Sequence, residues 1–138
     1  MIHNLETILV IFKQPRWLHE FIISKFSRNY KVECIFISNL IKKNNKEIIK
    51  LINTTIKNKK ISIALFEGDH ISIINFDFIN SIKVKKKGLF LFDDFMYHEI
   101  NDITGRACDF ILSGCPHSSL KFKKKGYQSL FMPVESDG

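Results

Sequence analysis

The sequence has few of the residues and motifs that build disulfide, metal or cofactor sites. Of its 138 residues only 3 are cysteines, and no two of them have CxxC spacing. The patterns GxxxxGK[ST], GxGxxG and GxSxG are all missing. Their absence argues against a phosphate-binding P-loop, a dinucleotide fingerprint and the nucleophile elbow of many hydrolases. We therefore expect buried, reduced thiols and no cofactor.

Long apolar runs are also missing. No segment approaches the ~20 apolar residues that cross a bilayer, and residues 1–6 lack the basic start of a signal peptide. These two absences predict a cytoplasmic protein.

The sequence contains six short, β-branched apolar runs separated by segments with helical spacing. The runs predict buried strands over residues 8–13, 32–38, 61–69, 88–94, 109–116 and 129–135. Helices are expected after Pro15 and over residues 40–57, 95–106 and 118–125, while residues 70–84 could include an extended piece. In the helix over 40–57, Ile48, Leu51, Ile52 and Thr55 are expected on one face. The alternation predicts one α/β domain over residues 1–138, with an open, doubly wound, mainly parallel six-stranded sheet, Rossmann-like, and helices on both faces.

Charge is expected to separate to the two edges of this sheet. The net charge is +7. Lysine runs precede three of the expected strands, at residues 57–60, 85–87 and 123–125. They can be solvated helix ends or a basic face that touches the inner surface of a membrane. Nucleic-acid binding is not expected, because no aromatic platform, helix-turn-helix or RNP pattern accompanies the lysines.

Polar residues follow the strands at the opposite edge, where ligands of open α/β sheets bind. The most conspicuous are Asp93 and Asp94, directly after an apolar run. A phosphoacceptor pair is disfavoured, because in response-regulator receivers the acids follow the first strand. A metal site is not expected: His98 lies four residues after Asp94, but two ligands are too few. Asp94 could also simply cap the following helix.

The second half of the chain resembles a known family. The matching residues are Asp93, Asp94, Asp109, Phe110, Ile111, Leu112, Ser113, Ser118, Phe122, Gly126 and Pro133. Their order and spacing resemble the amino-terminal domain of GT-B glycosyltransferases, especially the spore-maturation-type (CgeB-like) group. The resemblance spans residues 61–138, and the earlier residues share only the expected topology. It implies the acceptor-side lobe of a two-lobed enzyme, whose other lobe would bind the nucleotide-sugar donor.

This resemblance implies a glycan or glycolipid acceptor and assigns roles to the polar edge. Carboxylates, amides and rings are the groups that bind sugar hydroxyls and C–H faces, and an inverting transfer needs a general base. The catalytic candidates are Asp69, His70, Asp94 and His98; the acceptor-binding candidates are Glu67, Gly68, Asp93, Tyr97 and Arg16. Gly68 is expected to form a tight turn that brings backbone close to a ligand. The alternative is a non-catalytic flavodoxin-like or receiver-like binding or regulatory module.

Overall fold

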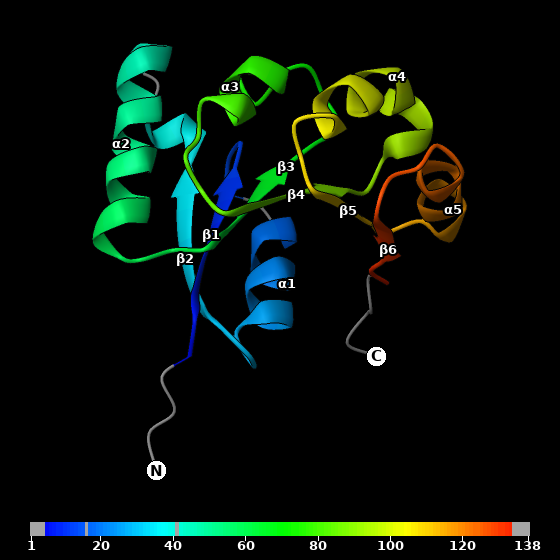
Figure 1. Cartoon of the computed structure of the whole chain (residues 1–138), viewed down its shortest axis with the longest axis horizontal. Helices are drawn as coiled ribbons and strands as arrows, with labels where there is room; N and C mark the ends of the chain where they lie inside the picture. The colour runs from blue at the N-terminus through cyan, green and yellow to red at the C-terminus, as the bar shows by residue number, and fades with distance from the viewer. Residues whose placement is uncertain (1–4, 16, 41, 134–138) are drawn as a thin grey trace.

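The computed structural model of the chain describes residues 5–15, 17–40 and 42–133, with the side chains of residues 17 and 18 not described. Six strands alternate with helices along it (Figure 1). The strands are β1 (Thr7–Phe12), β2 (Lys31–Phe36), β3 (Ile63–Glu67), β4 (Lys86–Leu91), β5 (Phe110–Ser113) and β6 (Ser129–Phe131). The helices are α1 (Trp17–Phe26), the 3₁₀ turn η1 (Ile37–Leu40), α2 (Asn45–Asn58), α3 (Phe76–Asn80), α4 (Asp94–Gly105) and α5 (Pro116–Lys124).

All six strands are parallel and form one open sheet in the order β2-β1-β3-β4-β5-β6. Val10 in β1 is paired with Cys34 on one side and with Leu65 on the other. The predicted fold class is confirmed. The order also places a topological switch point between β1 and β3, because the chain leaves these neighbouring strands in opposite directions.

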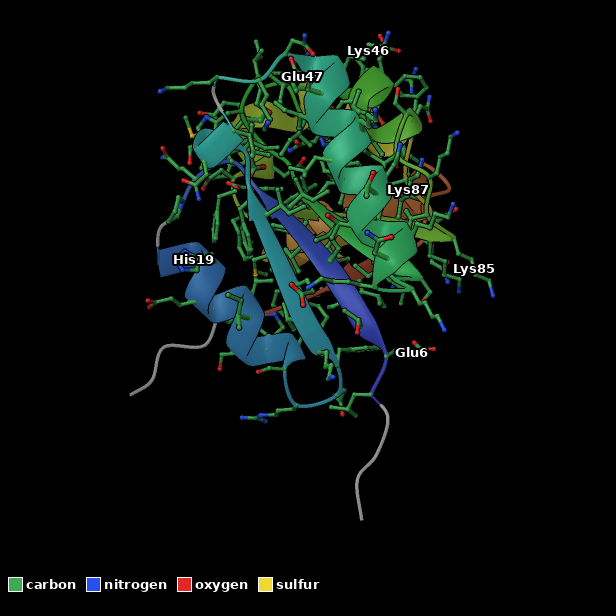
Figure 2. All side chains as sticks on the ribbon, turned by 90° about the vertical axis from the view of Figure 1, so that its left-hand side faces the viewer. Glu6, His19, Lys46, Glu47, Lys85 and Lys87 are labelled. Carbon is green, nitrogen blue, oxygen red and sulfur yellow. The ribbon has the colours of Figure 1, made fainter. Side chains whose placement is uncertain are left out.

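Two apolar layers sandwich the sheet, and they are unequal. Leu9 and Ile11 face a layer that includes residues of α2, α3 and α5. Ile8, Val10 and Phe12 face the other side, where α1 contributes the buried Ile22. Figure 1 shows α1 on the opposite side of the sheet from α3 and α4, and Figure 2 shows α1 and α2 flanking β1 and β2.

The helical segments differ from their predicted bounds for local reasons. The chain from Ile37 first forms η1, and α2 begins only at Asn45 because Asn44 and Glu47 form a capping box there. Within α2, Ile48, Ile52 and Ile56 are buried. Leu51, expected on the buried face, is 38% exposed, so that expectation was wrong. Among residues 70–84 the structure has the short helix α3 and no strand.

The predicted lysine edge lies where expected, and some of its side chains are engaged. Lys85 lies at the same end of the molecule as Glu6, which precedes β1, whereas Lys46 lies at the other end (Figure 2). Lys59 forms an ion pair of 2.8 Å with Glu33, and the ammonium of Lys87 donates to the carbonyl of Ile79. No helix of the described residues is long and apolar enough to span a membrane.

Candidate functional site

Asp69 lies two residues after β3, at the carboxyl edge of the sheet, and forms several hydrogen bonds there. Its backbone has a positive φ of 70°, a strained region that aspartate tolerates better than most residues. Its Oδ2 accepts hydrogen bonds from the backbone N–H groups of Phe92 (2.9 Å) and Asp93 (3.1 Å). The side chain therefore ties the end of β3 to the end of β4, and Asp69 is only 6% exposed.

Asp94, at the start of α4, also uses both carboxylate oxygens in contacts with other side chains. Its Oδ2 accepts the Ser118 hydroxyl (2.7 Å) and lies 2.9 Å from Nδ1 of His98. Its Oδ1 accepts from the amide of Asn101 (2.9 Å), and the residue is 2% exposed. Asp94 is the first residue of α4, and the N-cap position is occupied by Asp93, so Asp94 does not cap the helix. The possible metal pair Asp94 and His98 is instead a direct hydrogen bond.

Asn101, which was not among the candidates predicted from the sequence, connects the two carboxylates. Its Oδ1 accepts from the backbone N–H of Asp69 (2.8 Å), and its Nδ2 donates to Asp69 (3.0 Å) and to Asp94. The amide orientation is fixed, because a backbone N–H can only donate and a carboxylate only accept. We call Asp69, Asp94, His98, Asn101 and Ser118 the carboxylate network. No local sequence pattern pointed to Asn101, because its partners Asp94 and Asp69 lie 7 and 32 residues away in the chain.

His98 extends the carboxylate network toward α5. Its Nε2 lies 2.8 Å from the ammonium of Lys125. Because an ammonium only donates hydrogen bonds, Nε2 accepts and the ring proton sits on Nδ1, facing Asp94. The imidazole also packs against Phe122, with ring centroids 5.0 Å apart. Its side chain is 13% exposed, so His98 faces the protein interior more than the edge.

Glu67 and Gly68 are also turned inward. The Glu67 carboxylate accepts a hydrogen bond from the backbone N–H of Lys13 (2.8 Å), and the carbonyl of Gly68 accepts one from the ammonium of Lys13. Both contacts join the carboxyl ends of β1 and β3. A Cβ added to Gly68 would lie 2.3 Å from Cδ2 of Leu91. Any larger residue here would therefore force Leu91 to move. Because the φ of Gly68 is not positive, close packing favours glycine here, rather than the tight turn that we expected.

The remaining candidates form an exposed rim, which we define as His70, Asp93 and Tyr97. The rings of His70 and Tyr97 contact each other with centroids 4.4 Å apart, and this contact joins the loop after β3 to α4. Tyr97 has a non-helical backbone (φ −125°, ψ 21°) within α4. His70 and Asp93 are exposed, and Tyr97 is partly exposed. Arg16 lies outside the described residues.

Large apolar side chains are exposed at the same edge. Ile71 follows His70 and is 84% exposed, while Phe95 and Met96 in the first turn of α4 are 78% and 64% exposed. Aliphatic and aromatic side chains exposed together in this way commonly mark a contact surface.

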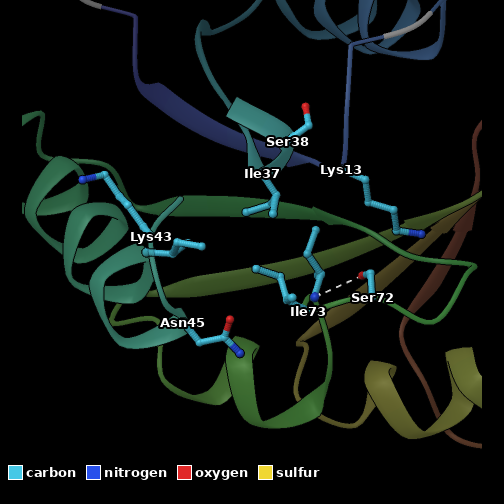
Figure 3. A pocket seen from close by; sticks show the side chains of 9 residues that line it. Lys13, Ile37, Ser38, Lys43, Asn45, Ser72 and Ile73 are labelled. Carbon is cyan, nitrogen blue, oxygen red and sulfur yellow. Dashed lines mark hydrogen bonds between the residues drawn. The ribbon is translucent and has the colours of Figure 1, made fainter. Parts of the chain in front are cut away.

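A cavity of about 400 Å³ opens at the switch point between β1 and β3. Its apolar wall consists of four isoleucines, Ile37, Ile48, Ile73 and Ile74. Its polar lining consists of Lys13, Ser38, Lys43, Asn45 and Ser72 (Figure 3). A ligand was expected at this edge of the sheet, but this cavity was not predicted from the sequence.

A second polar group, around Asp102 on α4, lies away from the rim. The Tyr127 hydroxyl donates to the Asp102 carboxylate (2.8 Å), and Lys125 and Arg106 lie 3.4 Å and 3.5 Å from it. Burial acts to raise the pKa of Asp102, but the Tyr127 hydroxyl and the Lys125 ammonium outweigh it, so the pKa lies below its ordinary value. The same burial and the Asp102 contact raise the pKa of Tyr127.

The three thiols are less buried than we expected, since Cys34, Cys108 and Cys115 are each partly exposed and unbridged. Burial nevertheless raises the pKa of Cys34 to about 11 and that of Cys108 to about 12. Among the described residues, no three His, Cys, Asp or Glu side chains are grouped so that they could hold a metal ion. No protein-family model, curated protein or solved structure matches the chain.

Proposed function

We propose that this domain binds the acceptor in a glycosyltransferase of the GT-B type, with the acceptor hydroxyl at the rim of His70, Asp93 and Tyr97. The observation that carries the proposal is the contact of His70 with Tyr97 beside the exposed Asp93, at the edge where α/β sheets bind ligands. A ring, an imidazole and a carboxylate suit the C–H face and the hydroxyls of a sugar. The resemblance over residues 61–138 supports the same role.

Burial divides the four catalytic candidates into two groups. Asp69, Asp94 and His98 have side-chain partners inside the carboxylate network. His70 is exposed and is the group that could accept a proton from a bound hydroxyl in an inverting transfer. The carboxylate network would then stabilise the conformation of the carboxyl edge of the sheet. The nucleotide-sugar donor would bind a second lobe, as the resemblance implies.

Sugar binding to the domain can be tested directly by heteronuclear NMR. Glucose, galactose, N-acetylglucosamine and their β1,4-linked disaccharides are titrated into the ¹⁵N-labelled chain. We expect at least one sugar to shift the amide resonances of the rim. His70→Gln and Asp93→Asn should each weaken that binding at least about fivefold, or about 1 kcal/mol.

The matched control is Asp77→Asn, which changes an exposed carboxylate on α3 and should leave the affinity within about twofold, under ~0.5 kcal/mol. Equal effects of Asp77→Asn and Asp93→Asn would show that charge alone, and not the rim, is responsible. If no sugar of the panel shifts the rim amides more than those of α3, the acceptor role is rejected.

The alternative is a non-catalytic flavodoxin-like binding module. It is favoured by one observation: the strand order through β5 is the flavodoxin-like order, with a cavity at the β1/β3 switch point. Binding of a ligand in that cavity together with no sugar binding at the rim would favour this alternative.

A further inference from the structure

The cavity at the switch point is lined by four separate parts of the chain. They are the end of β1 (Lys13), η1 (Ile37 and Ser38), Lys43 with the first turn of α2, and the loop after β3 from Ser72 to Ile74. The Ser72 hydroxyl accepts a hydrogen bond from the backbone N–H of Ile74 (3.0 Å), which shapes this loop (Figure 3). At about 400 Å³ the cavity has the size of sites that bind small molecules.

The inner wall of the cavity is aliphatic. Ile37 and Ile73 are partly exposed, and Ile37 extends from η1 toward the loop that carries Ile73 (Figure 3). Ile48 and Ile74 are 3% and 4% exposed, so they form its most buried part. No described lining residue is aromatic or acidic. Water against this wall has few hydrogen-bond partners, so an apolar molecule that displaces it gains free energy.

The two cationic side chains of the lining do not point into this space. The ammonium groups of Lys13 and Lys43 lie on opposite sides of the cavity and point away from each other (Figure 3). That of Lys13 donates to the carbonyl of Gly68, and Lys43 is exposed. A charged group inside the cavity would therefore lose its water without gaining an opposite charge. This arrangement favours an uncharged ligand.

We propose that this cavity binds the alkyl chain of an uncharged aliphatic molecule such as an alcohol, with the chain against Ile37, Ile48 and Ile73. Ser38 and Asn45 also line the cavity and are exposed, so a hydroxyl at the end of the chain can bind to them or to water. The inference goes beyond the proposed function, because the cavity and the rim share no residue.

The binding experiment titrates straight-chain alcohols, from butan-1-ol to octan-1-ol, into the chain labelled with ¹³C at the isoleucine methyl groups. We expect the methyl resonances of Ile48 and Ile73 to shift. Each added methylene group should raise the affinity about fourfold, or ~0.8 kcal/mol, until the cavity is full. Hexanoate, which has the same chain length as hexan-1-ol and a negative charge, should bind no more tightly than the alcohol, because neither ammonium group points into the cavity.

Three variants locate the site. Ile73→Trp fills the cavity from a partly exposed position and should abolish the methyl shifts of Ile48. Ile103→Trp is the matched control, because it introduces the same ring at an exposed position of α4 outside the lining, and it should change the affinity for hexan-1-ol less than about twofold. Lys43→Gln should also leave this affinity within about twofold. Circular dichroism and thermal unfolding verify that each variant is folded.

Four outcomes would overturn the proposal. The absence of shifts at Ile48 and Ile73 with every alcohol would show that the cavity takes no small aliphatic ligand. An affinity that does not rise with chain length would remove the role of the isoleucines. Tighter binding of hexanoate than of hexan-1-ol would assign the cavity to an anion, and shifts of Ile48 that persist in Ile73→Trp would place the binding elsewhere. None of these outcomes depends on whether a sugar binds the rim.

Discussion

The substitution Asp94→Asn tests whether the carboxylate network stabilises the carboxyl edge of the sheet. It keeps the shape of the side chain and replaces one acceptor oxygen by an NH₂ group. In the wild type, Oδ1 accepts from Asn101 and Oδ2 accepts from Ser118 and contacts Nδ1 of His98. Both oxygens of Asp94 are therefore required as acceptors.

No orientation of the new amide satisfies these partners. With its NH₂ at the Oδ1 position, the side chain faces the NH₂ of Asn101, which is held by Asp69. With its NH₂ at the Oδ2 position, it faces the Nδ1 proton of His98, which cannot move to Nε2 while Lys125 donates there. Either way two buried donors oppose each other. At ~1–3 kcal/mol for each buried group without a partner, and with some relaxation, we expect a loss of about 2–4 kcal/mol.

The assay is urea unfolding followed by far-ultraviolet circular dichroism, with Asp93→Asn as the matched control. Asp93 is the adjacent residue, is exposed, and makes no side-chain capping bond, so its variant should stay within about 0.5 kcal/mol of the wild type. If Asp94→Asn were equally harmless, the carboxylate network would not be contributing to stability. The expected loss also means that lower activity in Asp94→Asn would not by itself identify a catalytic group.

Three further predictions concern other parts of the fold. Gly68→Ala places a methyl group against the buried Leu91 and should cost about 1–3 kcal/mol; a urea midpoint equal to that of the wild type would refute the close packing. Tyr127→Phe removes the hydroxyl that helps to lower the pKa of Asp102, so NMR titration of that carboxyl should show its pKa rise. The lowered pKa of Asp102 in the folded state stabilises the protein above the unfolded-state pKa, and this stabilisation is lost as the pH falls. The loss of unfolding free energy in Tyr127→Phe should therefore be largest near neutral pH and become smaller in acid. Burial raises the pKa of Cys108 from 9.0 to about 12, so this thiol should react with iodoacetamide at pH 8.5 at least about a hundredfold more slowly than in the urea-unfolded chain. The stability that the buried thiol contributes is complete below its unfolded-state pKa and is lost as the pH rises toward its folded-state pKa.

The fold was predictable from the sequence because its strands are short, continuous apolar runs that burial on both faces requires. The run over residues 8–13 became β1 with bounds shifted by one residue. Element ends were harder to predict, because they depend on side-chain partners. The start of α2 is fixed by the reciprocal bonds of Asn44 and Glu47, which helical periodicity does not reveal.

The positions of the candidate residues at the sheet edge were predictable, but their contacts were not. Position at strand ends correctly brought Asp69 and Asp93 to one edge of the sheet, where the Asp69 carboxylate accepts a hydrogen bond from the backbone N–H of Asp93. The burial of Asp69 and Asp94 involves contacts with Asn101, which lies 32 residues after Asp69 in the chain, and no local pattern predicts such a pairing. The cavity was missed because its isoleucines and lysines belong to the residue types that dominate the whole chain.

The unequal covering of the sheet has a consequence for motion. The side of the sheet that carries Ile8 and Phe12 is covered, within the described residues, by a single helix, α1. Detachment of α1 would leave the opposite layer of helices and the carboxylate network intact, so it is expected to be the least costly partial unfolding of the domain. Its amide hydrogens should exchange with solvent faster than those of α2. The open form would expose Phe12 and Phe90, so brief opening of α1 is the route by which this domain is expected to aggregate.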